Sequence, residues 1–569
     1  MTLSLLNSQA RTVLAIGVLA AAAALGAPAA GAPPHLERRG AATQLIVDGK
    51  PWLILGGEVS NTGSTDMAGM DTVWPQLQRL HLNTALVGTA WAWVEPKEGA
   101  FDFKWVDQLI EGARAHDLRL VFLWFGSWKN SLSSFAPGWV KADQRRFPRV
   151  RIRSGQSVEI LTPLSEAARD GDERAYVAFM RHLAQVDGER HTVLMIQMEN
   201  EVGVLGDSRD RGAEADAAFA GPVPQELLEA LGKAQSALLR TPSAAGAPAG
   251  APAAGGSGWE KAFGPGNTAD EAFMAWQYGR YMGHIAAAGK AVYPIPVYTN
   301  TWIVQPSDRG PGDYPSGGPE PRVLDIWKAA APAIDFNAPD IYLPDFDVWT
   351  GRFHRPDNPL FIPESRGDSA GVANAFFAIG EHAAIGYSPF GIDEAHRLST
   401  QAAAAGAPLP LGRGYAVLGQ LASRILQRQS DGGITGAWLN SGHPRQDSTI
   451  GGYTIHFELR RDRRDPSKVA QLGCALALAE GPDAFIVAGT DVQVTFSPAP
   501  PADGIAGIAD AELGTVTDGT WVASRKMSGD DIVLDYDLAA AAQTGQSGSG
   551  LRFGPDGPIV QRVLLYRYR

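Results

Sequence analysis

The chain has 569 residues, and its 49 Lys and Arg against 61 Asp and Glu give a formal net charge of −12 at pH 7. This length corresponds to roughly two to four domains, and the acidic balance argues against a protein whose main task is to bind nucleic-acid backbones. The single cysteine, Cys474, excludes a disulfide framework as well as cysteine-based zinc and iron–sulfur sites.

The first 32 residues have the features of a secretory signal peptide. They contain no acidic residue and one basic residue, Arg11, which precedes an apolar run over 13–25 and a series of small residues over 27–32. The alternative is an N-terminal membrane anchor, but the apolar run is shorter than the roughly 20 residues that a spanning helix needs. We therefore expect residues 1–32 to be a signal peptide and the protein to be exported, to the periplasm or to the medium.

Eight short apolar runs follow, separated by amphipathic or loop-rich stretches such as 105–116. Their near-continuous hydrophobicity is typical of parallel strands that are covered on both faces. The runs are 52–59, 84–91, 118–125, 193–198, 295–301, 336–343, 359–363 and 384–390. Eight strand–helix units predict an α/β fold, a (β/α)8 TIM barrel over residues 40–405. An open doubly wound sheet is the alternative, but the chain lacks the phosphate-binding turn or nucleophile elbow expected there.

The connection after the fourth predicted strand contains a low-complexity stretch. Residues 241–258 are nearly all Ala, Gly, Pro and Ser, and they follow a predicted helix over 224–239. Such a composition cannot bury enough apolar surface to offset the entropy lost on ordering. We expect a flexible insertion in a barrel loop, since the strand pattern resumes after it.

The pattern changes to alternating apolar and polar residues in the last part of the chain. After a predicted helix over 415–427, strands are predicted at 453–459, 492–496, 534–538 and 560–568. We therefore expect residues 406–569 to form a helix followed by an antiparallel β-sandwich domain.

Two glutamates stand where predicted strands end. The fourth strand ends in Glu199-Asn200-Glu201, and the seventh ends in Glu364. In a barrel the carboxyl ends of the strands meet on one face, which carries the active site. A pair of carboxyl groups there is what glycoside hydrolysis requires, because one protonates the leaving oxygen and the other attacks the sugar or activates water.

These motifs resemble those of bacterial glycoside hydrolase family 35 β-galactosidases, which belong to the clan A retaining glycosidases. Residues 197–203 are similar to the Gln-x-Glu-Asn-Glu-x-Gly signature of that family, and residues 91–103 to a segment that families 35 and 42 share. The resemblance implies that Glu201 is the acid/base and Glu364 the nucleophile. It also implies that Asn200 binds the hydroxyl at C2 and that Tyr342, after the sixth strand, holds the nucleophile. No metal or organic cofactor is implied.

The chain departs from the family in two places. Ala92 and Val94 stand where many members have Asn and His, and residues 125–130 replace a common Cys-Ala-Glu-Trp stretch that helps to recognise the hydroxyls of the sugar in the family. The sugar specificity is therefore less well defined than the mechanism.

Five further residues are candidates for substrate binding. Glu58 ends the first strand and could bind a sugar hydroxyl or brace the barrel, and Asn130 could donate to the sugar. Thirteen of the fifteen tryptophans precede residue 350. Of these, Trp91, Trp128 and Trp302 lie near strand ends, where an indole could stack on a pyranose ring or belong to the core.

The sequence thus predicts an exported retaining exo-β-glycosidase, in the first place a β-galactosidase that releases terminal β-galactosyl units from plant-type oligosaccharides or polysaccharide side chains. The alternatives are the same mechanism on a β-glucoside, β-xyloside or β-mannoside, and a non-catalytic carbohydrate-binding barrel. We expect no cofactor, no nucleic-acid partner and no membrane span, and the oligomeric state stays open.

Overall fold

The computed structural model describes residues 31–569 except 235, 237, 239–257, 395–409, 463–464, 466 and 501–502. Residues 32–569 form one compact unit. Three predictions lie outside the described residues: the signal peptide, except its last two residues, the insertion at 241–258, except its last residue, and the domain boundary at 405/406. Within the described part, none of the helices combines the length and apolar character that a membrane crossing needs.

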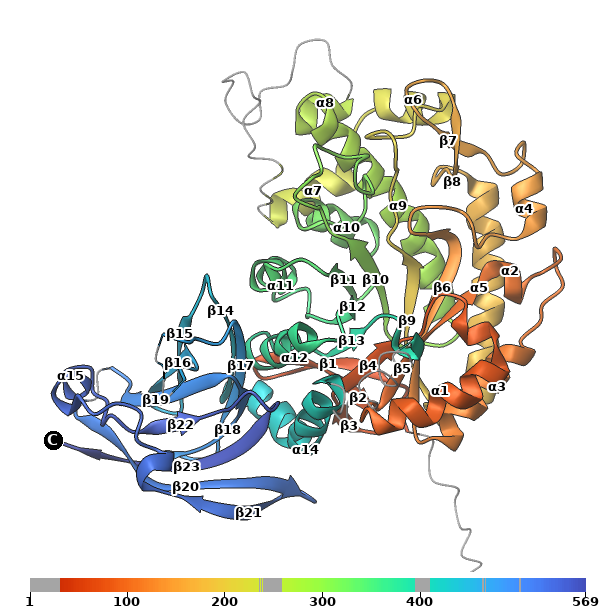
Figure 1. Cartoon of the computed structure of the whole chain (residues 1–569). Coiled ribbons are helices and arrows are strands. Elements are labelled where there is room, and N and C mark those ends of the chain that lie inside the picture. Colours follow the sequence, from red (N-terminus) through yellow and green to blue (C-terminus); the bar gives the residue numbers. More distant parts are fainter. Residues whose placement is uncertain are drawn as a thin grey trace, which may run out of the picture. The chain divides into compact units, whose positions relative to one another are not determined.

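Eight parallel strands close into a barrel, as predicted (Figure 1). Each strand overlaps one of the eight apolar runs, and the strands lie in the barrel in their order along the chain. They are β4 (Ile54–Glu58), β5 (Thr84–Ala90), β6 (Arg119–Lys129), β9 (Val193–Asn200), β10 (Val297–Trp302), β11 (Phe336–Ile341), β12 (Ile362–Ser365) and β13 (Gly386–Pro389). The strands are buried on both faces, which explains why they show no alternation.

Helices cover the outside of the barrel with their apolar sides inward. In α3, for example, Val106, Leu109, Ile110 and Ala113 recur at helical spacing and are all buried. The principal helices are α1 (Met67–Arg79), α3 (Lys104–Ala115), α5 (Glu166–Asp187), α9 (Asn267–Lys290), α10 (Leu324–Ala330), α11 (Phe346–Phe353), α12 (Ser369–Glu381) and α14 (Pro410–Asp431).

Short elements inserted in the βα loops gather on one side of the barrel, at the top of Figure 1. They are α4 (Gly138–Ala142), β7 (Arg149–Arg151), β8 (Ser157–Leu161), α6 (Ala213–Ala220), α7 (Gln225–Lys233) and α8 (Gly258–Phe263).

A small antiparallel sheet that the sequence did not predict precedes the barrel. It consists of β1 (His35–Arg39), β2 (Ala42–Val47) and β3 (Lys50–Trp52). Leu45 and Val47 of β2 pack in one buried cluster with inward-facing residues of the barrel strands, such as Ile54 and Leu86. The sheet therefore fills the amino end of the barrel, which leaves the carboxyl end for a site.

The last part of the chain forms two antiparallel sheets after α14, in agreement with the predicted sandwich. One sheet has the order β14-β17-β18-β23-β20-β21 and the other β15-β16-β19-β22. The strands are β14 (Ile434–Asn440), β15 (Arg445–Ile450), β16 (Tyr453–Leu459), β17 (Leu472–Ala479), β18 (Ala484–Thr490), β19 (Val492–Pro498), β20 (Ile505–Thr517), β21 (Thr520–Met527), β22 (Gly550–Arg552) and β23 (Ile559–Tyr568).

The prediction of a strand at 534–538 is wrong. This segment is a loop that leads into α15 (Leu538–Gln543). The carboxylate of Asp537 accepts a hydrogen bond from the backbone N–H of Ala540 and so caps the helix, and Tyr536 is 74% exposed. The alternating pattern arose from cap and loop residues and not from a buried sheet face.

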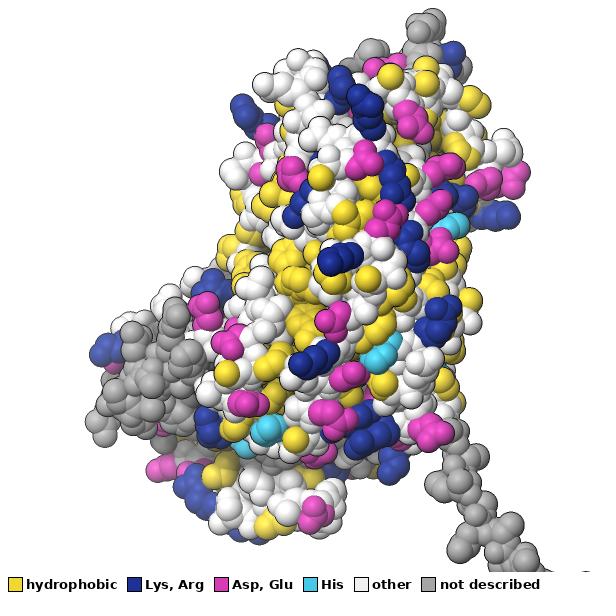
Figure 2. Space-filling view, turned by 90° about the vertical axis from the view of Figure 1, so that its right-hand side faces the viewer, with side chains coloured by type: hydrophobic (Ala, Val, Ile, Leu, Met, Phe, Trp, Pro, Cys, Tyr) yellow, Lys and Arg dark blue, Asp and Glu magenta, His cyan; other side chains and the backbone are white. Residues whose placement is uncertain are grey.

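Charged side chains of both signs are mixed over the face displayed in Figure 2, with hydrophobic side chains between them. That face therefore shows no continuous basic surface.

Candidate active site

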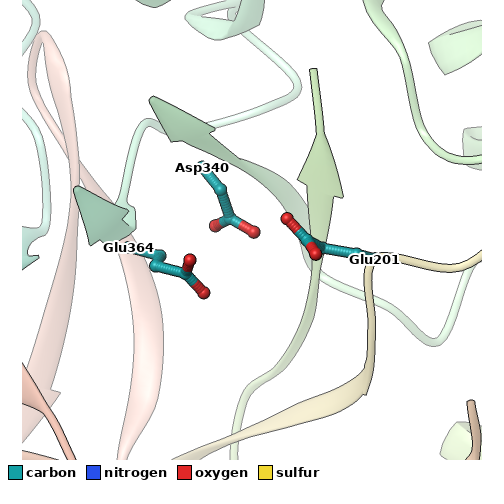
Figure 3. A group of neighbouring side chains, drawn as sticks. All are labelled: Glu201, Asp340 and Glu364. Atoms are coloured by element: carbon teal, nitrogen blue, oxygen red, sulfur yellow. The ribbon is translucent and has the colours of Figure 1, made fainter. Parts of the chain in front are cut away.

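Three carboxyl groups meet at the carboxyl end of the barrel (Figure 3). Glu201 follows β9, Asp340 lies in β11 and Glu364 lies in β12, and one oxygen of each lies within 4.8 Å of the others. All three side chains are buried, with exposed fractions of 7%, 3% and 9%. The two predicted catalytic glutamates are thus brought together, and a third acid stands beside them.

The backbone holds Glu201 in an unusual conformation. Its φ is 48°, in the left-handed region that few non-glycine residues adopt. The backbone N–H of Glu201 donates to Oδ1 of Asn300 at 2.9 Å, and the hydroxyl of Ser131 donates to its carbonyl at 3.0 Å. Two residues on, Gly203 has a φ of 148°, and a Cβ there would come within 2.5 Å of the backbone of Pro315. The glycine of the signature is therefore needed for close packing.

The surroundings of Glu201 suit a general acid. Burial and the charge of Glu364 raise its pKa to about 7, against the opposing effects of Lys129 and Asp340. The amide of Asn130 donates from Nδ2 to Oε2 of Glu201 at 2.8 Å and orients the carboxyl group. A carboxyl group with a pKa near neutrality can both give and take a proton during turnover.

Two neighbours of Glu364 favour its charged form. The Tyr342 hydroxyl donates to Oε1 of Glu364 at 2.7 Å, as the family resemblance implied. Burial raises the pKa of Glu364 above its usual value, and the charge of Lys129 and the Tyr342 hydrogen bond offset only part of this rise. Tyr342 itself is 43% exposed, so it stands at the open side of the site.

A buried lysine connects the carboxyl ends of β6 and β9. Lys129, at the end of β6, is 4% exposed and donates from Nζ to Oδ1 of Asn200 at 3.0 Å. The backbone N–H of Asn130 also donates to this oxygen, at 3.3 Å. The Nδ2 donor of Asn200 is buried and has no partner among the described residues. It is therefore available to a ligand hydroxyl.

Glu58 faces the same centre from the end of β4. Burial raises its pKa well above the usual value, and the charge of Glu364 adds to this effect while that of Lys129 opposes it. The side chain has no exposed area, and neither carboxyl oxygen has a hydrogen-bond partner within the described ranges. Glu58 therefore interacts electrostatically with both Glu364 and Lys129.

The structure does not support two of the three tryptophan predictions. Trp91 and Trp128 are fully buried. Their indole N–H groups donate to Oε2 of Glu95 at 2.8 Å and to the carbonyl of Leu161 at 3.0 Å. Neither indole offers an open face to a sugar, because aromatic neighbours from the loops and helices pack against both. Trp302, at the end of β10, is only partly buried and remains available.

Glu199, two residues before Glu201, has a structural role. Its fully buried carboxyl group accepts hydrogen bonds from three successive backbone N–H groups, those of Gly126, Ser127 and Trp128, at 3.1, 2.9 and 2.7 Å. These contacts fix the end of β6, from which Lys129 and Asn130 reach the site.

Two residues of the site were missed in the sequence. Asn300 lies in β10 and Asp340 in β11, both close to the carboxyl ends of these strands, and Nδ2 of Asn300 donates to Oδ2 of Asp340 at 2.6 Å. Both are polar residues at the carboxyl ends of predicted strands, so the rule that identified Glu201 and Glu364 also applied to them.

Two family models match parts of the chain. Residues 68–231 match glycoside hydrolase family 42, described as beta-galactosidase, and residues 411–536 match DUF5597, described as a domain of unknown function. The first match includes Glu201 and ends before Glu364, and it covers less than half of the chain. It agrees with the predicted glycoside hydrolase, which is confirmed at that level, while membership of family 35 stays a prediction. No curated protein matches the chain.

Solved structures with some similarity include the catalytic domain of beta-amylase from Paenibacillus polymyxa, at 13% identity and a TM-score of 0.42, over 59% of this chain and 92% of that one. The beta-galactosidases from Bacillus circulans sp. alkalophilus and Rahnella sp. R3 are 16% and 18% identical, with TM-scores of 0.41 and 0.40, over 59% and 60% of this chain. The chain covers only 50% of each of these two proteins. The barrel is established by its strand pairing, to which these similarities add no argument.

Proposed function

We propose that this protein is a retaining β-glycosidase that acts on β-galactosides by double displacement. The observation that carries the proposal is the separation of Glu201 and Glu364, whose nearest oxygens lie within 4.8 Å of each other. Retaining enzymes place their carboxyl groups about 5–5.5 Å apart, whereas inverting enzymes leave roughly 6.5–9.5 Å for a water molecule.

In the first half of the reaction, an oxygen of Glu364 forms a bond to the anomeric carbon as the bond to the leaving oxygen breaks. Glu201 gives its proton to that leaving oxygen. The product is a glycosyl ester on Glu364, which no longer carries a charge. Because the charge of Glu364 contributes to the raised pKa of Glu201, its loss allows Glu201 to stay ionised.

In the second half, Glu201 takes a proton from water, whose oxygen attacks the anomeric carbon and releases Glu364 as a carboxylate. Two displacements at the same carbon restore the original configuration. Asn200 is placed to bind the substrate with its unpartnered Nδ2, since the transition state of glycoside hydrolysis is stabilised by hydrogen bonds to the 2-hydroxyl.

The decisive experiment replaces the nucleophile. In Glu364→Ala, turnover of an aryl β-galactoside should be lost, and added azide should restore it with the α-galactosyl azide as product. Glu189→Ala, which changes an exposed glutamate at the other end of β9, is the control and should keep full activity. Activity in Glu364→Ala without azide would refute the assignment.

The β-galactosidase assignment is supported by the match of residues 68–231 to a family described as beta-galactosidase. Terminal galactosyl units of plant-type oligosaccharides are the proposed substrates. A panel of aryl β-galactoside, β-glucoside, β-xyloside and β-mannoside tests the sugar. Binding of oligosaccharides without hydrolysis of any of these compounds would favour a carbohydrate-binding barrel instead.

Export is also proposed, on the basis of the charge and apolar pattern of residues 1–32. Expression of the full chain in a bacterial host should yield a periplasmic or secreted protein whose N-terminus, measured by mass spectrometry, lies near residue 33. A cytoplasmic protein that retains Met1 or its neighbours would contradict this proposal.

A further inference from the structure

Asp340 is a buried acid that the double-displacement scheme does not use. It lies in β11 directly beside β12, where its backbone is in register with that of Glu364. Its side chain is 3% exposed and lies within reach of both catalytic glutamates. Its Oδ1 has no hydrogen-bond partner in the described part of the chain.

The orientation of Asn300 determines which oxygen of Asp340 can carry a proton. The backbone N–H of Glu201 can only donate, so the atom of Asn300 that faces it must be Oδ1. The other end of the amide, Nδ2, therefore points at Oδ2 of Asp340, 2.6 Å away, and Oδ2 must accept. A proton on Asp340 consequently resides on Oδ1.

The charges around Asp340 favour the protonated acid. Burial, and then the charges of Glu364, Glu201 and Glu58, raise the pKa of Asp340 well above its usual value. Lys129 lowers the pKa of Glu58, Glu201 and Glu364, but it is not among the main influences on Asp340. The titratable groups that face Asp340 are the carboxyl groups of Glu58, Glu201 and Glu364 and the hydroxyls of Tyr298 and Tyr342.

We propose that Asp340 is a neutral positioning residue whose Oδ1–H donates to the Glu201 carboxylate and so allows the acid/base to ionise for the second half of the reaction. This inference rests on the proposed function. Asp340 keeps its proton throughout, and the proton that leaves Glu201 goes to the departing oxygen and is replaced from water. A neutral acid that donates to a carboxylate lowers the pKa of the carboxylate, and its own pKa rises. Asp340 and Glu201 show these opposite effects, because Asp340 lowers the pKa of Glu201 while Glu201 raises that of Asp340.

Two substitutions separate this role from that of a negative charge. Asp340→Asn keeps an acceptor for Asn300 and a donor for Glu201. Asp340→Ala removes both. Far-UV circular dichroism and Tm identify any variant that fails to fold, and Asp340→Ser is the replacement if Asp340→Ala does.

The measurements are kcat/KM and kcat of an aryl β-galactoside with a good leaving group, each as a function of pH. In Asp340→Ala the alkaline limb of kcat/KM and the acid limb of kcat should both move up by about one to two pH units, because ionised Glu201 loses a hydrogen bond. At pH 5–6 the glycosyl-enzyme should then accumulate, visible as a burst of released phenol and as a covalent adduct by intact mass. Asp340→Asn should show neither change.

The opposite result has a distinct signature. If Asp340 is ionised, both Asp340→Asn and Asp340→Ala remove a negative charge next to Glu201, and both limbs move to lower pH. That outcome, or unchanged limbs in Asp340→Ala, would overturn the inference. If the proposed function itself is wrong, the unaltered protein will not hydrolyse the aryl β-galactoside, or Glu364→Ala will hydrolyse it equally well. Either result is distinct from a shift in the pH limbs.

Discussion

The hydroxyl of Tyr342 donates to one oxygen of Glu364, Oε1, at 2.7 Å, while the other oxygen, Oε2, has no partner in the described chain. The tyrosine follows β11 and the glutamate lies in β12, so adjacent strand ends create this contact. It leaves Oε2 as the oxygen free to attack the anomeric carbon.

Removal of this hydroxyl should weaken the nucleophile. In Tyr342→Phe the pKa of Glu364 should rise, because the hydrogen bond that favours its charged form is lost. The acid limb of kcat/KM should therefore move to higher pH, and kcat/KM at neutral pH should fall about tenfold to hundredfold. Tyr293→Phe is the matched control, since the Tyr293 hydroxyl is buried without a partner in the described residues. An unchanged acid limb in Tyr342→Phe would contradict the role of the hydroxyl.

Asn200 should contribute through the hydroxyl at C2 of the substrate. Asn200→Ala removes the unpartnered Nδ2 donor and should lower kcat/KM about a hundredfold for a normal aryl β-galactoside. The same substitution should have a much smaller effect on the 2-deoxy substrate, which cannot accept this hydrogen bond. Equal losses on the two substrates would instead point to the contact between Asn200 and Lys129 as the cause.

Glu199 should matter for stability. Glu199→Gln cannot accept hydrogen bonds from all three N–H groups at the end of β6, and each amide left unpaired in the interior costs about 1–3 kcal/mol. Thermal unfolding followed by circular dichroism should show a lower Tm than the unaltered protein. Glu189→Gln, at an exposed position, should keep the original Tm. A Tm for Glu199→Gln equal to that of this control would show that the three contacts do not stabilise the fold.

Glu201 should make the fold less stable as pH rises. Its pKa is about 7 in the folded protein against 4.5 for the free group, so the folded state binds more protons between these values. Stability from this residue is fully present at low pH and is lost as pH rises toward 7, by about 3 kcal/mol in total.

Glu201→Gln removes the cost of burying an ionised carboxylate at this position. Its Tm should exceed that of the unaltered protein at pH 8, and the two should agree closely at pH 4.5. Urea unfolding at the two pH values measures the difference in free energy. A variant that is less stable than the unaltered protein at pH 8 would show that the ionised carboxylate is well compensated in the native site.

The barrel was predictable because each of its eight strands overlaps a short, nearly continuous apolar run in the sequence. The two glutamates proposed as the catalytic pair were predictable because Glu364 follows one such run directly and Glu201 stands three residues after the end of another. The tryptophans were not, because residue type and position near a strand end do not reveal burial. Trp128 lies in the core, and its backbone N–H donates to Glu199, a residue 71 positions away that no local pattern connects with it. Likewise, the segment at 534–538 alternates in polarity, yet Asp537 caps a helix there.

The helix that follows the nucleophile strand also carries the junction with the C-terminal sheets. The carboxylate of Glu381, at the end of α12, accepts from the Thr435 hydroxyl in β14 at 2.8 Å, and Nε2 of Gln429 in α14 donates to the carbonyl of Ile379 at 3.0 Å. Gly380 lies so close to the backbone of Gly436 that a Cβ would meet it at 2.8 Å. The C-terminal sheets therefore cover the helix that follows the nucleophile strand. A shortened enzyme that ends after the barrel would expose one side of α12, and any redesign of the barrel has to preserve the surface of α12 that these sheets contact.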